Sequence, residues 1–207
     1  MRLNKHTVLL LIMMFFASPA LAEDVIYSPD NCEFQVTLPS EPHKAQRCKP
    51  DAPEDCHAVT SFTHVFGLDA TVDVRLTCNK AEDQMYERYS GDIMRATLEA
   101  MAGKNKLGEY ESHYQEHDNA KQAVLIGSGA SGNNNKIYMM QLWIGKTSVF
   151  TIEGELIGGP HEEADDMFAD ILKSARQKEN TEAAESEEGD DEEDKDSAED
   201  EEEPEDE

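Results

Sequence analysis

The sequence predicts an α+β domain in which helices pack on the faces of an antiparallel sheet. Three observations lead to this class. Residues 136–158 form two β-rich runs that are apolar on both faces, several other runs alternate apolar and polar residues, and two stretches repeat apolar residues at helical spacing. A sheet that is apolar on both faces needs cover on both faces, so the domain should be an α/β/α sandwich.

The central hairpin is expected to turn at Gly145-Lys146, because glycine at the first central position suits a type II′ turn. That turn pairs Ile144 with Thr147 and Leu142 with Val149. One face then collects Ile137, Met139, Trp143, Phe150, Ile152 and Leu156. The other face collects Tyr138, Met140, Leu142, Ile144 and Val149, and becomes polar at Thr151, Glu153 and Glu155.

The remaining strands and loops follow from alternation and turn residues. Strands are expected at 25–38, 59–66, 70–78, 109–117 and 120–126. The polar stretches 43–57 and 127–135 are interpreted as loops.

Two amphipathic helices are expected. The first is capped by Asn79, with Glu82 completing a capping box, and ends at Gly103. Its apolar stripe is Met85, Tyr86, Tyr89, Ile93, Met94, Leu98 and Met101. The second opens at Gly158-Gly159-Pro160, and its stripe is Ala164, Met167, Phe168, Ile171, Leu172 and Ala175.

The order of strands, helix, strands, helix resembles the Mog1/PsbP-like α/β/α sandwich over residues 25–178. The opening residues Phe34, Val36, Pro39 and Pro42 and the terminal helix 167–174 carry the resemblance. It implies an accessory or binding role without catalysis, as in photosystem lumenal subunits and small exported bacterial domains. It transfers no functional residue.

The chain opens with a predicted signal peptide at 1–22. Arg2 and Lys5 precede an apolar core at 8–16, and Ala20-Leu21-Ala22 forms a cleavage site. That core is too short to span a bilayer, which needs ~20 residues. No cysteine follows the cleavage site, so a lipoprotein anchor is not expected. We therefore expect a single domain at 23–178, soluble in the periplasm or secreted.

Four cysteines, Cys32, Cys48, Cys56 and Cys78, predict two disulfides in an exported chain. Local geometry favours the pairs Cys32–Cys48 and Cys56–Cys78. The pairs Cys48–Cys56 and Cys32–Cys78 are the nearest alternative. Because no Cys-x-x-Cys occurs, a zinc site has little support.

The chain is acidic, with a formal net charge of −27. The tail 179–207 holds 19 acidic residues and one lysine, and the part before it is acidic too, so nucleic acid is not an expected partner. The tail is expected to be disordered and solubilising. A weak divalent cation or a basic partner at the tail is the alternative.

The candidate sites each have a plainer structural explanation. Gly127–Gly132 fits the dinucleotide pattern G-x-G-x-x-G, but three asparagines and a strand follow in place of a helix. His113 and His117 share a strand face without a third metal ligand. His64, opposite Val72, is interpreted as a histidine at the edge of the core. We expect no catalytic, cofactor or metal site.

Three further candidates concern hydrolytic chemistry. Ser128, Ser131 and Ser148 lack a nucleophile signature. Glu153 and Glu155 share a face, which is interpreted as a solvated strand face in preference to a glycosidase pair.

The sequence therefore favours an exported, non-enzymatic accessory or binding module for an unknown protein or small ligand. An exported hydrolase that uses a histidine is the alternative, and a cation-binding protein that acts through its tail is a third possibility.

Truncation after Lys178 should leave the melting temperature nearly unchanged or raise it, because the tail lacks the apolar residues that would offset the entropy of ordering. Calorimetry of both chains at moderate salt tests this. A clear fall in melting temperature would show that the tail docks on the domain.

Overall fold

A computed structural model describes residues 24–49, 52–105 and 107–179; the predicted signal peptide and the tail beyond Glu179 lie outside them. Its main feature is a seven-stranded, fully antiparallel sheet in the order β3-β4-β5-β9-β8-β7-β6. The strands are β3 (His43–Lys49), β4 (Ala52–Phe66), β5 (Ala70–Lys80), β6 (Glu109–Glu116), β7 (Lys121–Ser131), β8 (Asn134–Ile144) and β9 (Ser148–Gly158).

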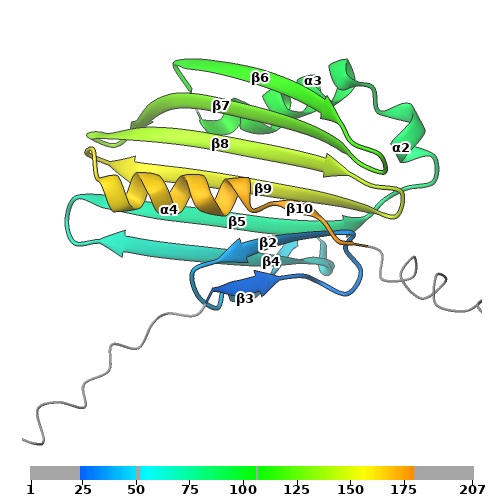
Figure 1. Cartoon of the computed structure of the whole chain (residues 1–207), viewed down its shortest axis with the longest axis horizontal. Helices are drawn as coiled ribbons and strands as arrows, with labels where there is room; N and C mark the ends of the chain where they lie inside the picture. The colour runs from blue at the N-terminus through cyan, green and yellow to red at the C-terminus, as the bar shows by residue number, and fades with distance from the viewer. Residues whose placement is uncertain (1–23, 50–51, 106, 180–207) are drawn as a thin grey trace, which may run out of the picture.

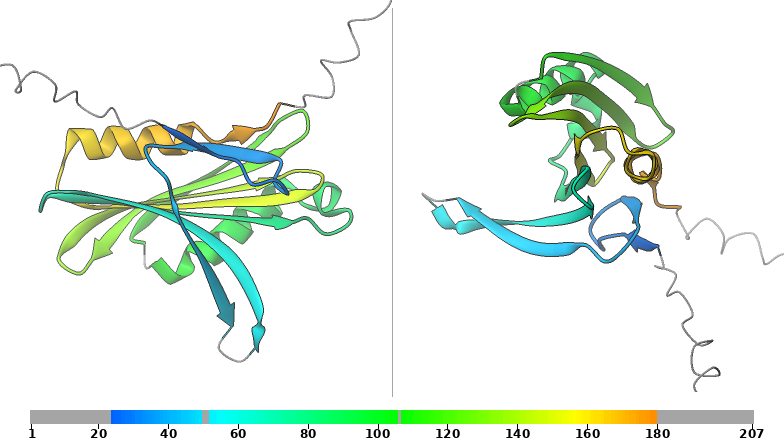
Figure 2. Two further views of the ribbon diagram at one scale, coloured as in Figure 1. Left: turned by 90° about the horizontal axis from the view of Figure 1, so that it is seen from below. Right: turned by 90° about the vertical axis from the view of Figure 1, so that its left-hand side faces the viewer.

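Both faces of this sheet are covered, as Figures 1 and 2 show. One face carries helix α4 (Glu162–Lys173) and a small sheet in the order β1-β2-β10. Those strands are β1 (Val25–Tyr27), β2 (Phe34–Leu38) and β10 (Arg176–Gln177). The other face carries α3 (Gly91–Ala102), which is preceded by α2 (Met85–Arg88) and followed by the 3-10 turn η2 (Gly103–Asn105). The predicted α+β class, an antiparallel sheet with helices on its faces, is confirmed.

The two faces of the β8–β9 hairpin belong to separate cores, as predicted. Trp143 and Phe150 are buried under α4 and β2, where the Phe34 ring contacts both of theirs at centroid distances of 5.6 and 6.1 Å. Tyr138, Met140, Leu142 and Ile144 are buried with Met94, Leu98 and Ala102 of α3. Since successive strand residues point to opposite faces, one hairpin supplies both cores.

The predicted turn of this hairpin is wrong by two residues in register. Ile144 pairs with Val149, and Trp143 pairs with Phe150, so the turn is centred on Lys146-Thr147 instead of Gly145-Lys146. Gly145 N donates to Ser148 O at 2.9 Å to close it. A shift of two residues keeps every side chain on its predicted face, because the side-chain period of a strand is two.

The Glu33 carboxylate accounts for the shifted turn. It accepts hydrogen bonds from the backbone N–H groups of Lys146, Thr147 and Ser148 at 3.2, 2.8 and 2.9 Å. Ser148 Oγ donates to the same carboxylate at 3.1 Å and accepts from Glu33 N at 2.9 Å. A Cβ on Gly145 would run into the carboxylate, so this position requires glycine. The loop is shaped around a carboxylate from a distant segment, which local turn preferences do not reveal.

The single helix expected from Asn79 to Gly103 is two helices. Asn79 lies in β5, α2 is one turn long, and Ser90 caps α3 by accepting from Ile93 N at 3.4 Å. A Cβ on Gly91 would lie 2.8 Å from the Tyr114 ring. The start of α3 therefore packs so closely on β6 that position 91 has no room for a side chain.

Both stretches interpreted as loops are strands. β3 and the start of β4 fill most of 43–57, and β7 and β8 run to a turn beside Gly132, which has φ +61°. The described side chains from 43 to 48 are mostly exposed, so the usual alternation of apolar and polar residues is absent. Backbone pairing continues the sheet there without that alternation.

The favoured disulfide pairing is wrong, and the alternative pairing is correct: Cys32 bonds Cys78, and Cys48 bonds Cys56. The β3–β4 register places Cys48 directly opposite Cys56. Cys32 precedes β2, which lies over the sheet, and it meets Cys78 near the end of β5. The first bond ties the small sheet to the large one.

Replacing Phe168 by Ala should cost ~3–5 kcal/mol in the free energy of unfolding. Phe168 is 5% exposed and rests on Gly154, where a Cβ would lie 2.8 Å from its ring. Replacing the exposed Glu163 on the same helix by Ala should cost under about 0.5 kcal/mol. Chemical denaturation of both variants checks the difference, and equal small effects would contradict the packing of α4.

Candidate binding groove

Helix α3 covers only part of its face of the sheet. It packs on β6, β7 and β8 and leaves β9, β5 and β4 without a covering helix among the described residues. The β3–β4 hairpin projects on the same side as α3, so the two flank this open part (Figure 2, right). The predicted change to polar residues at Thr151, Glu153 and Glu155 falls on it.

A groove of 920 Å³ follows this open part. One wall is the outer side of α3, the floor comes from β5, β8 and β9, and Arg47 of β3 stands on the far side. Its lining is Arg47, Arg75, Ile93, Ala96, Thr97, Ala100, Met101, Asn105, Met140 and Glu153. The helix stripe was predicted, but its members Ile93 and Met101 remain 46% and 40% exposed. Helix α3 thus presents apolar side chains to the groove as well as to the core.

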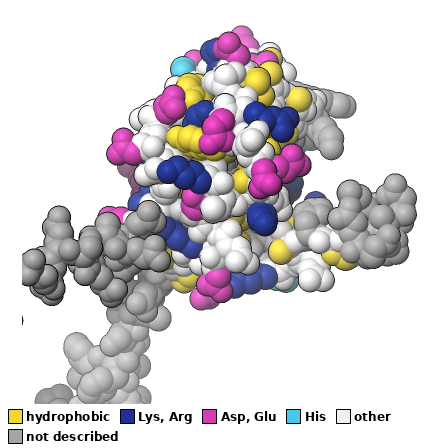
Figure 3. Space-filling model, turned by 90° about the vertical axis from the view of Figure 1, so that its right-hand side faces the viewer, with side chains coloured by type: hydrophobic (Ala, Val, Ile, Leu, Met, Phe, Trp, Pro, Cys, Tyr) yellow, Lys and Arg dark blue, Asp and Glu magenta, His cyan; other side chains and the backbone are white. Residues whose placement is uncertain are grey.

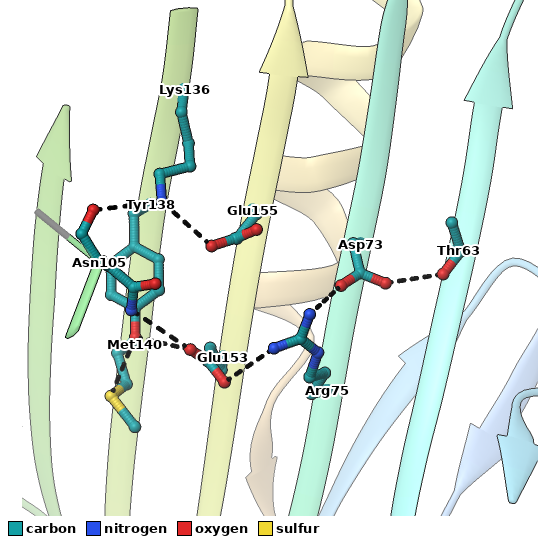
Figure 4. A network of polar contacts seen from close by, with 9 residues as sticks. All are labelled: Thr63, Asp73, Arg75, Asn105, Lys136, Tyr138, Met140, Glu153 and Glu155. Carbon is teal, nitrogen blue, oxygen red and sulfur yellow. Dashed lines mark hydrogen bonds and ion pairs between the residues drawn. The ribbon is translucent and has the colours of Figure 1, made fainter. Parts of the chain in front are cut away.

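A chain of polar contacts forms the groove floor (Figure 4). Thr63 Oγ1 donates to Asp73 at 2.7 Å, and Asp73 accepts from Arg75 at 3.1 Å. Arg75 lies 3.7 Å from Glu153 in an ion pair. Glu153 also accepts from Tyr138 Oη at 3.1 Å and from Asn105 Nδ2 at 3.4 Å. These contacts fix the side chains of four neighbouring strands.

Beside this chain of polar contacts, the Nζ atom of the buried Lys136 forms an ion pair with Glu155 Oε1 at 3.2 Å. It also donates a hydrogen bond to Asn105 O at 3.4 Å. The interpretation of Glu153 and Glu155 as a solvated strand face is therefore wrong. Each carboxylate has its own cation, and the side chains are only 26% and 16% exposed. Their positions on β9 could be read from the sequence, but their partners on β5 and β8 are set by register.

Burial, together with the neighbouring Glu153 charge, raises the pKa of the Tyr138 hydroxyl above its usual value of 10. Its side chain is completely buried beneath the groove floor. The hydroxyl therefore stays protonated and donates to Glu153, which is a structural use of a tyrosine.

The histidine candidates are dispersed. His113 is an exposed residue 3.6 Å from Glu111, and His117 stacks on Trp143 with ring centroids 5.3 Å apart. His64 lies opposite Val72, as predicted, at an exposed position between the rings of Phe62 and Phe66. Within the described residues, no three His, Cys, Asp or Glu side chains are arranged to hold a metal ion.

The glycine motif lies within β7, and Ser148 has a structural role. Gly127 to Ser131 lie in β7, and β8 follows, so no helix N-terminus meets a pyrophosphate. A Cβ on Gly127 would lie 2.8 Å from Glu109 O, which explains that glycine by close strand packing. Ser148 is buried and binds Glu33.

The end of the molecule that bears the β8–β9 turn carries mixed charges. Figure 3 shows Lys and Arg side chains interspersed there with Asp and Glu. This face offers no continuous cationic strip to a nucleic-acid backbone. Of the helices in 24–49, 52–105 and 107–179, none combines the length and apolar character needed to cross a membrane.

Replacing Tyr138 by Phe should flatten the loss of stability at alkaline pH. In the wild type the unfolded chain releases this proton near pH 10 while the folded chain keeps it, so stability falls as pH rises above about 10. Urea denaturation between about pH 9 and 11 measures the slope. Tyr110→Phe, at a 53% exposed position, is the control. Equal slopes in all three proteins would contradict the burial of this hydroxyl.

Comparison with known proteins gives likeness of structure only. No family model and no curated protein sequence matches the chain. A cyanobacterial PsbP (CyanoP) from Synechocystis is 12% identical, with a TM-score of 0.47 over 78% of this chain and 96% of that one. A mutant of Mog1 is 10% identical, with a TM-score of 0.40 over 75% and 96%. LpqN, described as involved in cell envelope biogenesis of Mycobacterium tuberculosis, is 14% identical, with a TM-score of 0.34 over 77% and 86%.

The matches thus include the two proteins that give the predicted Mog1/PsbP-like group its name. The sheet with helices on both faces is the arrangement expected of that sandwich. At these identities the likeness concerns the fold alone.

Proposed function

We propose that this protein is an exported, non-enzymatic binding module that holds its partner in the groove beside α3. The observation that carries the proposal is the outer side of α3, where Ile93 and Met101 stay exposed beside an ordered polar floor. Apolar side chains at a groove with few, fixed polar groups are typical of binding sites.

Export is supported by the signal pattern at 1–22 and by two disulfides in the folded part, since such bonds persist in oxidising compartments.

Binding without catalysis is supported by the polar groups of the floor. Glu153 and Glu155 are held by protein donors, and the buried Ser148 is engaged by Glu33.

Ile93→Asp should lower partner recovery at least tenfold, because it places a charge on the apolar wall. Capture from the exported fraction of the source cells, followed by quantitative mass spectrometry, compares wild type and variant. Asp is tolerated in the first turn of α3, so the fold should persist. Leu68→Asp, at a fully exposed apolar position in the β4–β5 turn, is the control.

Equal recovery by wild type and Ile93→Asp would contradict the groove as the binding site. Turnover of a substrate in a hydrolase screen, abolished by a histidine or serine substitution, would replace the proposal with the hydrolase alternative.

A further inference from the structure

The side chains that line the groove beside α3 carry a net positive charge, although the protein is acidic. Its ionisable lining residues are Arg47, Arg75 and Glu153, a net charge of +1 in a chain of net charge −27. Three other hollows have linings with a net charge of −1. Their ionisable residues are Asp24, Asp170 and Lys173 in one, Asp165 in another, and Asp30, Glu33 and Lys80 in the third. In the groove beside α3, Asp73 of the floor and Glu153 both pair with Arg75, so Arg47 is the cation that an anionic group would meet.

Arg47 supplies the available cation. It is exposed on β3, and its side chain forms no hydrogen bond or ion pair with any of the side chains that the structure describes. Arg75 is held by Asp73 and Glu153, yet its side chain remains 39% exposed. A carboxylate at Arg47 would therefore gain a charge-assisted hydrogen bond without displacing a partner from the described part of the chain.

The α3 wall suits a polypeptide chain. The small side chains of Ala96, Thr97 and Ala100 lie between the larger Ile93 and Met101 along two turns of the helix. Small residues let another backbone approach closely, and the two larger ones offer apolar contacts at either end. The apolar wall and Arg47 together favour an occupant that carries apolar and acidic side chains side by side.

We propose that the occupant is a peptide segment of another protein that places an Asp or Glu on Arg47 and apolar side chains on Ile93 and Met101. This rests on the proposed function, because it names the partner of the same groove. Charge complementarity gives the contact specificity, and the apolar wall gives it area.

The test is selection of a random 12-residue peptide library on the exported chain, tail included. The enriched peptides should carry Asp or Glu next to Leu, Ile or Phe. Arg47→Glu should weaken the best peptide at least tenfold, and 0.5 M salt should weaken it too. Lys44→Glu is the matched control. It makes the same change of charge sign at an exposed position on the opposite face of the same strand, so its effect should stay within about threefold.

The outcomes separate this inference from the proposed function. One outcome is that peptide binding depends on Ile93, while the peptides carry no acidic residues and their binding does not depend on Arg47. That result would overturn the acidic partner and leave the groove as a binding site. Peptides unaffected by both Ile93→Asp and Arg47→Glu would overturn both.

Two further probes test other occupants. A synthetic peptide of residues 179–207 that displaces the selected peptides at low salt would make the chain's own tail the occupant and overturn the proposal. Arg47-dependent binding to vesicles of phosphatidylglycerol, without acidic enrichment in the library, would identify a lipid surface and overturn it as well.

Discussion

The constraint on which the structure depends is the two-sided burial of the β8–β9 hairpin. Strand residues that point to opposite faces are apolar on both, so one layer must form on each side. The layer of α4 and β2 covers β5 and β9, whereas the short α3 covers β6, β7 and β8. On the part of the sheet face that α3 does not cover, the strand residues are polar and form ion pairs and hydrogen bonds with one another. The groove is thus the boundary between the part of a sheet face that is buried and the part that is not.

A second constraint joins the layers. Cys32 and Glu33 are adjacent, yet the first is bonded to β5 and the second is surrounded by the donors of the β8–β9 turn. Lys178 N donates to Glu33 O at 2.8 Å, and Lys178 Nζ donates to Pro29 O at 2.6 Å, which fastens the chain after β10 to the same segment. The start of β2 is therefore held by a covalent bond, an anion–turn contact and backbone hydrogen bonds. These contacts position the layer that covers Trp143 and Phe150.

Much of the fold could be predicted because it depends on periodicity. The faces of β8 and β9, the burial of Phe168, Ile171 and Leu172, and the position of His64 opposite Val72 all follow from spacing along one or two elements. The hairpin register, the break at Ser90 and the cysteine pairing depend on contacts between distant residues. The Glu33 carboxylate binds the N–H groups of the turn, and the Tyr114 ring leaves no room for a side chain at position 91. Cys32, which precedes β2, forms its disulfide with Cys78 of β5.

The candidate site was predicted less well than the fold. The apolar stripe on α3 and the polar end of β9 were visible in the sequence. Their meeting with Arg47 was not, because β3 has exposed side chains along most of its length and so lacks the alternation that marks a half-buried strand. A net charge of −27 also gives no sign of the cation that Arg47 places beside this groove.

The cross-strand bond between Cys48 and Cys56 has a consequence for the thermodynamics of recognition. Its partners are only 8 positions apart in sequence, against 46 for Cys32 and Cys78, so it restricts the unfolded chain less. What it restricts instead is the projecting hairpin that carries Arg47. The conformational entropy of that wall is lost when the bond forms during oxidative folding, before any partner arrives. In the proposed complex, association would begin from a pre-organised surface, so less of the contact energy would be spent on ordering and more would remain as affinity.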